Sequence, residues 1–460
     1  MRDFTKGNAA KQILMFSIPM LIGNLFQQVY SMVDAVVVGR YVGGSALAAV
    51  GVAMNVLTFM LSVLIGLTTG ASVVISQFYG AKQHDRLERT MSTSIIFLTI
   101  FSVGIAVIGI VLSPWLLQLL NATPDIMDDA AVYMRVLMGG MIFPVFYNMY
   151  TAYLRALGDS RSPLLILVAC TVLNTGLDLL LVLYFNMGVM GAAVATIIAQ
   201  AVSAILCFLY TRHYVPLLSV RKLTFDWKLF RAILKYGTPA ALQLSIVSLA
   251  SLTITRLINS FGTAAMAGIT AAGKIDQMAI MPVSNISMAL STFVAQNMGA
   301  GQEERSRKGL RASLLLMVVL AVSISGLLLL LGPRIITMFL SQDDANASEI
   351  LRVGLEYLNV LVLFYFLFAL LFAFNGFFRG AGDAIAAMAL PVSSLTIRTI
   401  AAYLLVHLAG MGPEALAWSI PIGWGLCSLA GWVYYRKRLW TGKAITQTQD
   451  FSPESSEVEV

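Results

Sequence analysis

The chain is written as two hydrophobic halves in which the same short motifs recur in the same order. Gln77-Phe78-Tyr79-Gly80-Ala81 in the first half matches Gln296-Asn297-Met298-Gly299-Ala300 in the second, 219 positions later. Arg155-Ala156-Leu157-Gly158-Asp159 matches Arg379-Gly380-Ala381-Gly382-Asp383, 224 positions later. Repeats of this kind fold into related bundles around a central cleft, which is typical of membrane proteins that move a solute across the bilayer.

Composition places the whole chain in a membrane. Its 460 residues are 58% hydrophobic and 12% charged, with a mean hydropathy of +0.82, which excludes a water-soluble globule. Crossing about 30 Å of hydrocarbon takes about 20 apolar residues, and the sequence supplies about twelve such runs. We predict an all-α integral membrane protein with about twelve transmembrane helices in two pseudo-symmetric six-helix lobes.

The expected organisation has three parts. Residues 1–220 form the N-terminal lobe and residues 221–440 form the C-terminal lobe. Residues 441–460 are acidic and lack periodicity, and we expect them to be a disordered cytoplasmic tail. The Gly-Asp pairs at 158–159 and 382–383 fall in equivalent loops, where we expect a turn and a helix cap rather than catalysis.

The net charge of +7 is better explained by membrane topology than by nucleic-acid binding. Lys and Arg gather at alternate ends of the spans, as with Lys82, Arg86 and Arg89, and the opposite loops are short or acidic, as around Asp125. Basic loops stay in the cytoplasm. We therefore predict a multi-pass protein of the cell membrane with both termini in the cytoplasm.

Cysteine and histidine give no sign of an enzyme or a metal centre. Cys170, Cys207 and Cys427 lie singly in apolar runs, and no pair has metal-ligand or redox spacing. The three histidines are scattered, so no acid-histidine pair suggests catalysis at the membrane boundary. We expect no cofactor and no enzymatic activity.

Chemistry then rests on the few ionisable side chains inside the spans. Each costs about 2.5 to 3.5 kcal/mol or more at the bilayer centre, so such groups usually line a cavity or a relay. The alternative is a structural pair within the bundle. The candidates are Asp34, Asp178, Lys274, Asp276 and Arg398.

Counting from the outer turns brings three oxygen-bearing side chains to one depth. Asp178 lies about eight residues before the turn at 185–188 and Thr196 about nine after it, which puts both roughly 12 to 14 Å below the surface. Asp34 precedes its own outer turn by about eight residues. Asn174 lies on the face of Asp178, one turn deeper.

Such a cluster has two uses, and residue types do not decide between them. Two carboxylates close together in an apolar surrounding can share a proton. Carboxylate, amide and hydroxyl oxygens together also suit a hard cation such as Na⁺. The second half lacks these groups, because Asn174 aligns with Arg398 and Asp178 aligns with Ala402.

Four segments of the first half resemble the multidrug and toxic compound extrusion (MATE) transporters, and the resemblance extends over nearly the whole chain. It implies cation-coupled efflux of bulky, often cationic or amphipathic compounds, with H⁺ or Na⁺ as the coupling ion and alternating access between two lobes. A single chain supplies both lobes, so a monomer suffices. The matching segments are Gln28–Gly39, Arg155–Pro163, Asn174–Asp178 and Gly191–Thr196.

The resemblance also implies roles for particular residues. Asp34, Asn174, Asp178 and Thr196 would form a cation site in the first lobe, able to hold a proton or Na⁺. Tyr133 and Asn148 would be supporting polar groups. Pro19 matches the proline at which the first helix of the family bends.

One departure concerns the second lobe. A branch of the family carries a glutamate eight residues after the proline of its seventh helix, whereas Val247 stands at that spacing from Pro239. This favours the DinF-like branch, in which the first-lobe acids do the coupling. Lys274, Asp276 and Arg398 are then open to two interpretations, a structural bridge between Asp276 and Arg398 or contact with a charged substrate.

Two other functions fit the sequence less well. A flippase for a lipid-linked sugar or lipid shares this fold, but it would need longer cationic rows than Lys274 and Arg398 provide. A polytopic membrane enzyme would need a catalytic constellation that the sequence does not offer. Between the two ions, H⁺ is favoured, because paired carboxylates share a proton without further ligands.

Overall fold

The computed structural model describes residues 2–120, 122–218, 220, 222–338, 346–448 and 451. Within these residues the chain is helical and contains no β-strand. It divides into two compact units. Unit 1 comprises Met1–Asp3 and Ile18–Ala241, and unit 2 comprises Phe4–Ser17 and Leu242–Val460. These units are defined by packing alone. The predicted lobes, residues 1–220 and 221–440, therefore stay a prediction.

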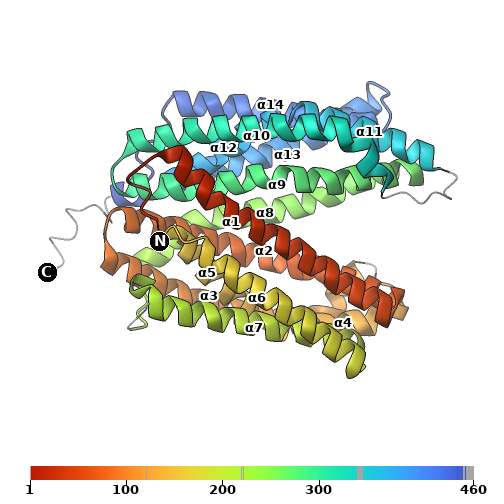
Figure 1. Ribbon diagram of the computed structural model, residues 1–460, viewed down its shortest axis with the longest axis horizontal. Helices are drawn as coiled ribbons and strands as arrows, with labels where there is room; N and C mark the ends of the chain where they lie inside the picture. The colour runs from red at the N-terminus through yellow and green to blue at the C-terminus, as the bar shows by residue number, and fades with distance from the viewer. Residues whose placement is uncertain are drawn as a thin grey trace. The chain divides into compact units, whose positions relative to one another are not determined.

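Unit 1 is a bundle whose helices run along one common direction (Figure 1). Two of its helices, α1 and α6, continue into π-helical turns, η1 and η2. Its elements are α1 (Ala9–Val37, from Ile18 onward), η1 (Val38–Val42), α2 (Gly44–Gly80), α3 (His84–Leu119), α4 (Pro124–Gly139), α5 (Ile142–Ala156), α6 (Arg161–Asp178), η2 (Leu179–Tyr184), α7 (Gly188–Tyr214), the 3₁₀ turn η3 (Pro216–Leu218) and the start of α8 (Trp227–Asn259).

Unit 2 repeats this order of helices, and its described residues contain no π-helical turn. It also includes the first residues of α1, up to Ser17. Its elements are the remainder of α8, α9 (Thr263–Gly299), α10 (Glu303–Thr337), α11 (Ala347–Leu363), α12 (Tyr365–Ala381), α13 (Ala384–His407), α14 (Glu414–Arg436) and the 3₁₀ turn η4 (Ile445–Gln447).

The predicted number of spans is confirmed, but two of them are broken. Among the described residues, ten helices are long and apolar enough to cross a membrane, and the bent pairs α4–α5 and α11–α12 raise the number to twelve. The pairs bend by 51° and 53°. Neither of these two breaks was predicted from the sequence. In the first pair the cause is Pro144, which lacks an N–H and whose ring excludes the carbonyl four residues earlier, at Gly140.

Small residues let helices approach closely within each unit. In unit 1, a Cβ added to Gly70 of α2 would lie 2.2 Å from the backbone nitrogen of Gly237 in α8. In unit 2, a Cβ on Gly380 of α12 would lie 2.3 Å from the carbonyl oxygen of Ser291 in α9. Close backbone packing of this kind is the usual source of helix association in a bilayer, where apolar side chains gain little from leaving lipid.

The two halves build the same loop at their matching Gly-Asp pairs. Asp159 accepts hydrogen bonds from the backbone N–H of Ser162, at 3.1 Å, and from the hydroxyl of Tyr210, at 3.1 Å. Asp383 accepts from the backbone N–H of Ala386, at 3.2 Å, and from the hydroxyl of Tyr434, at 2.6 Å. Asp383 is the N-cap of α13, and Asp159, one residue before the N-cap of α6, accepts from the first turn of its helix in the same way, which agrees with the predicted turn and cap.

The segment after α14 is ordered, at least in its first part. The side chains of Ala444 and Ile445 are buried, so the prediction of disorder from Thr441 onward is wrong for residues 441–448. The reason is apolar contact: the indole of Trp440, fully buried, packs against the rings of Phe377 and Tyr435. Residues 449–450 and 452–460 lie outside the described residues.

Candidate cation-coupling site

Two acids in unit 1, the half-buried Asp34 and the buried Asp178, lie on helices whose winding changes beside them. Asp178 is the last residue of α6, and the π-helical turn η2 follows at once. Asp34 lies in α1, four residues before the π-helical turn η1. In η2 the backbone N–H of Phe185 donates to the carbonyl of Leu180, at 3.1 Å, five residues back. π-Helical turns are rare and occur frequently at functional sites.

Five buried side-chain atoms of this region have no hydrogen-bond partner within the described part of the chain. They are Oδ1 of Asp34, both carboxylate oxygens of Asp178 and both side-chain atoms of Asn174. The side chains of Asp178 and Asn174 are 0% and 1% exposed. Buried polar groups are normally paired, and leaving one unpaired costs about 1 to 3 kcal/mol. Several such groups together mark a site whose oxygens are available to a proton or a cation.

The predicted acids come together. Asp34 and Asp178 are close enough to interact electrostatically, although they lie 144 positions apart on different helices. Asn174 lies one helical turn before Asp178 on the same face of α6. Asp34, Asp178 and Asn174 therefore belong to one region of unit 1.

Thr196 joins the region through a tyrosine that the sequence analysis missed. The hydroxyl of Tyr30 in α1 donates to Oγ1 of Thr196 in α7, at 3.3 Å, and Tyr30 lies within electrostatic range of both acids. Gln200, also missed, has a buried Oε1 without a partner among the described residues. Tyr30 is one turn before Asp34 and Gln200 is one turn after Thr196, and this spacing was the available signal.

The two supporting residues differ in position. Tyr133 of α4 is buried, its hydroxyl donates to the sulfur of Met54 at 3.9 Å, and it lies within electrostatic range of Asp34 and Asp178. The amide of Asn148 in α5 donates to the carbonyl of Pro144, at 2.8 Å, in its own helix. Its hydrogen bond therefore supports the helix beside the α4–α5 break.

Pro19 is buried within α1, and the helix continues through it. A proline in a helix leaves the carbonyl four residues earlier, here that of Met15, without its usual donor. Unit 1 begins at Ile18, so the weak point of α1 is also the place where the helix passes from one unit to the other.

The site thus joins two carboxylates, an amide and hydroxyl groups inside a membrane lobe. A family model described as MatE matches residues 19–180 and 239–404, which is most of the chain. The chain belongs to the MATE family. The first matched segment begins at Pro19 and contains Asp34, Asn174 and Asp178, and the second begins at Pro239.

Relatives match over nearly the full length of this MATE protein. The "Probable multidrug resistance protein YpnP" of Bacillus subtilis (strain 168) is 30% identical over 439 residues, covering 95% of this chain and 97% of its own. The "Probable multidrug resistance protein YoeA" of the same organism is 26% identical, covering 96% of each.

A solved structure shares the fold. A MOP superfamily transporter from Pyrococcus furiosus Vc1 (DSM3638) aligns with a TM-score of 0.87 at 24% identity, covering 95% of this chain and 97% of that chain. Together with the spans described above, the family and the fold make this a multi-pass membrane protein.

The second half holds a different polar cluster. The hydroxyl of Tyr365 in α12 donates to Oδ1 of Asp276 in α9, at 2.8 Å. Arg398 of α13 interacts electrostatically with Asp276, but no salt bridge joins them in the described structure, and its Nε is buried without a partner there. The carboxylate of Asp276 is thus held by a tyrosine hydrogen bond, and both interpretations of Asp276 and Arg398, a structural bridge or contact with a charged substrate, stay predictions. Lys274, two residues earlier, is exposed.

Proposed function

We propose that this MATE protein is an antiporter in which a cation binding at Asp34 and Asp178 drives export of bulky organic compounds, often cationic or amphipathic. The observation that supports this most is the set of buried carboxylate oxygens without hydrogen-bond partners in the described structure. Intramembrane acids of this kind mark ion pathways and proton relays. Asn174 and Thr196 complete the site, and Tyr133 supports it.

The coupling step follows from electrostatics. With both acids ionised, two like charges lie close together in an apolar surrounding, which favours uptake of a proton or Na⁺. Uptake removes the repulsion between Asp34 on α1 and Asp178 on α6, so it favours a different placement of α1. The Tyr30–Thr196 hydrogen bond connects α1 to α7, and Pro19 supplies the point at which α1 bends.

We favour the proton as the coupling ion. A carboxylate pair takes up a proton without any further ligand, whereas Na⁺ needs several oxygens at once. The amide of Asn174, the hydroxyl of Thr196 and Oε1 of Gln200 are the additional oxygens that a Na⁺ site would use. Substitution of these three residues should therefore weaken Na⁺-driven transport more than H⁺-driven transport, which distinguishes the two coupling ions.

The substrate class rests on the relatives. Both Bacillus subtilis relatives bear the name of probable multidrug resistance proteins, and a relative in Staphylococcus aureus (strain MW2), 22% identical, is named "Multidrug export protein MepA". We propose the same role here, in the cell membrane, with both termini in the cytoplasm and one chain as the working unit.

The function is tested with purified protein in liposomes loaded with a cationic dye. An imposed pH gradient at equal Na⁺ should drive dye movement, and a protonophore should abolish it. A Na⁺ gradient at matched pH is the second arm. Transport that follows Na⁺ and ignores pH would replace H⁺ by Na⁺ as the coupling ion, and no transport under either gradient would overturn the antiporter.

The orientation is tested by labelling single cysteines in intact cells. Asp125→Cys should react with an impermeant reagent added outside, and Lys82→Cys should not, because the basic loop is predicted to be cytoplasmic. Cys170, Cys207 and Cys427 are buried, so they give a low background. The reverse labelling pattern would invert the topology.

A further inference from the structure

Unit 1 contains a second site that the proposed antiport does not use. It is a cavity of about 960 Å³ between α3, α5, α7 and residues 215–226, which connect α7 to α8 and are called the linker below. This volume is at the upper end of the range of about 300 to 1,000 Å³ that is usual for small-molecule pockets. The cavity is lined mainly by aliphatic and aromatic side chains, among them Ile95, Phe146, Ile205, Phe208 and Leu218.

Two polar groups in the lining are available for a ligand. Tyr150 is 4% exposed, its ring packs against those of Phe146 and Phe208, and its hydroxyl has no hydrogen-bond partner in the described part of the chain. Arg212, in the last turn of α7, is exposed and forms no ion pair with another described residue. A hydroxyl within the apolar part and a cation at the end of the helix suit an amphiphile with an acidic head.

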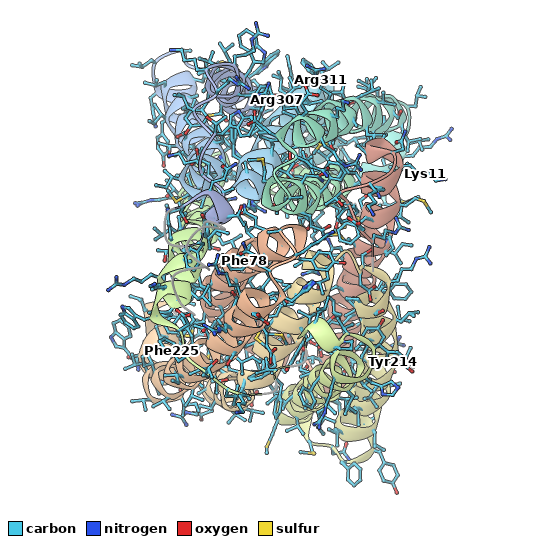
Figure 2. The ribbon with its side chains drawn as sticks, turned by 90° about the vertical axis from the view of Figure 1, so that its left-hand side faces the viewer. Lys11, Phe78, Tyr214, Phe225, Arg307 and Arg311 are labelled. Atoms are coloured by element: carbon cyan, nitrogen blue, oxygen red, sulfur yellow. The ribbon has the colours of Figure 1, made fainter. Side chains whose placement is uncertain are left out.

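The linker forms one wall of the cavity and is hydrogen-bonded to α3. Leu218, Val220 and Leu223 line the cavity. The hydroxyl of Ser92 in α3 donates to the carbonyl of Thr224, at 2.8 Å, and accepts from its N–H, at 2.6 Å. Tyr214 and Phe225, which flank the linker, lie on opposite sides of this end of unit 1 (Figure 2). The two hydrogen bonds to Ser92 hold the part of the linker next to Leu223 against α3.

The surroundings favour an anionic occupant from the bilayer. Lys222 and Lys228 are exposed in or just after the linker, and the nearby carboxylate of Asp226 is engaged by the N–H groups of Lys228 and Leu229. Basic pockets between membrane helices on the cytoplasmic side bind anionic lipid headgroups. The side chains of Ile205 and Phe208, 54% and 42% exposed, border the cavity with apolar surface that suits hydrocarbon chains.

The second half fills the corresponding region with its own chain. Thr211 and Arg212 of α7 correspond to Tyr435 and Arg436 of α14, 224 positions later. There the indole of Trp440, from the segment after α14, stacks on the ring of Tyr435, with centroids 6.0 Å apart, and is fully buried. The guanidinium of Arg436 lies over the ring of Trp432, at 5.6 Å.

We propose that the cavity between α3, α5, α7 and the linker binds an anionic phospholipid of the bilayer, with its acyl chain among Phe146, Ile205 and Phe208 and its phosphate at Arg212. The lipid takes the place that Trp440 fills in the second half. It braces the linker against α3, and so stabilises the start of α8 that unit 1 carries.

The test uses the full-length protein in detergent, stripped of lipid and offered phosphatidylglycerol or phosphatidylcholine with identical acyl chains. Native mass spectrometry should detect tighter retention of phosphatidylglycerol. Arg212→Gln should reduce that preference about fivefold, equivalent to about 1 kcal/mol for one basic residue near an anionic lipid. Arg436→Gln, at the corresponding position of the second half, is the matched control and should leave it unchanged.

Further arms separate the alternative occupants. Ala204→Trp should fill the cavity and reduce the retention of both lipids. If this variant fails to fold, Ile205→Trp at the exposed rim of the cavity replaces it and should have the same effect. Glycerol phosphate, the head without chains, should not compete. Equal retention of both lipids, equal effects of Arg212→Gln and Arg436→Gln, or displacement of the lipid by the cationic dye would each overturn the proposal.

Discussion

The two halves of the chain have the same order of helices but differ in whether their intramembrane carboxylates are hydrogen-bonded. Asn174 corresponds to Arg398 and Tyr133 to Tyr357, each 224 positions apart. In the first half the carboxylate oxygens of Asp178 have no partner among the described residues. In the second half Asp276 receives a hydrogen bond from Tyr365, and Arg398 lies within electrostatic range.

This difference indicates which carboxylates can bind a cation. A carboxylate paired with a tyrosine and close to an arginine is already stabilised, so a cation gains little by binding there. Two unpaired carboxylates beside an amide gain much more from the same cation. The repeat therefore provides two similar scaffolds, and only the first keeps its acids available.

The largest effect is expected from neutralising the first-half acids. Asp34→Asn and Asp178→Asn should each reduce gradient-driven dye efflux to the level of empty liposomes, while the protein still inserts, because each change removes a buried charge. Asp276→Asn should transport at a rate close to that of the unmodified protein. Normal efflux by both first-half variants would remove the distinction between the halves.

A smaller effect is expected from the uncharged members of the site. Thr196→Val and Asn174→Ala remove oxygens but no proton carrier, so under H⁺ coupling each should retain measurable pH-driven efflux. Thr399→Val in the second half, where the hydroxyl of Thr399 donates to its own helix, is a control for loss of a half-buried hydroxyl. Loss as complete as in Asp178→Asn would indicate Na⁺ coordination instead.

The smallest effects concern the free energy of unfolding. Removing a tyrosine hydroxyl should cost more in the second half than in the first. Tyr365→Phe removes the donor to Asp276 and should lower the free energy of unfolding by about 1 to 3 kcal/mol, the cost of leaving a partly buried carboxylate without this partner. Tyr30→Phe should cost less, about 1 kcal/mol, because it removes one hydrogen bond between neutral hydroxyls. Thermal unfolding in detergent compares them, and the opposite order would contradict this view of the second half.

Much of this architecture follows from the sequence because membrane helices have a fixed rise and length. Depth counting related Asp34 to Asp178, and the spacing of four placed Asn174 beside Asp178. Tyr30 and Gln200 escaped because aromatic and amide side chains in spans more often pack than bind. Each nevertheless lies one turn from a predicted site residue.

Other features depend on tertiary contacts that no local pattern encodes. The π-helical turns η1 and η2 follow apolar runs that look like ordinary helix. The packing of Trp440 against Phe377 orders a segment whose composition alone suggests disorder. The break between α4 and α5 was within reach, since Pro144 lies inside the predicted span.

The central claim, that substrate and proton exchange at Asp34 and Asp178, is tested most directly by measuring proton release from the purified protein. Addition of a cationic dye to the protein in weakly buffered detergent should release protons, detected by a pH indicator, in the unmodified protein and in Asp276→Asn. Asp34→Asn and Asp178→Asn should release none. Equal proton release from all four proteins would contradict the account.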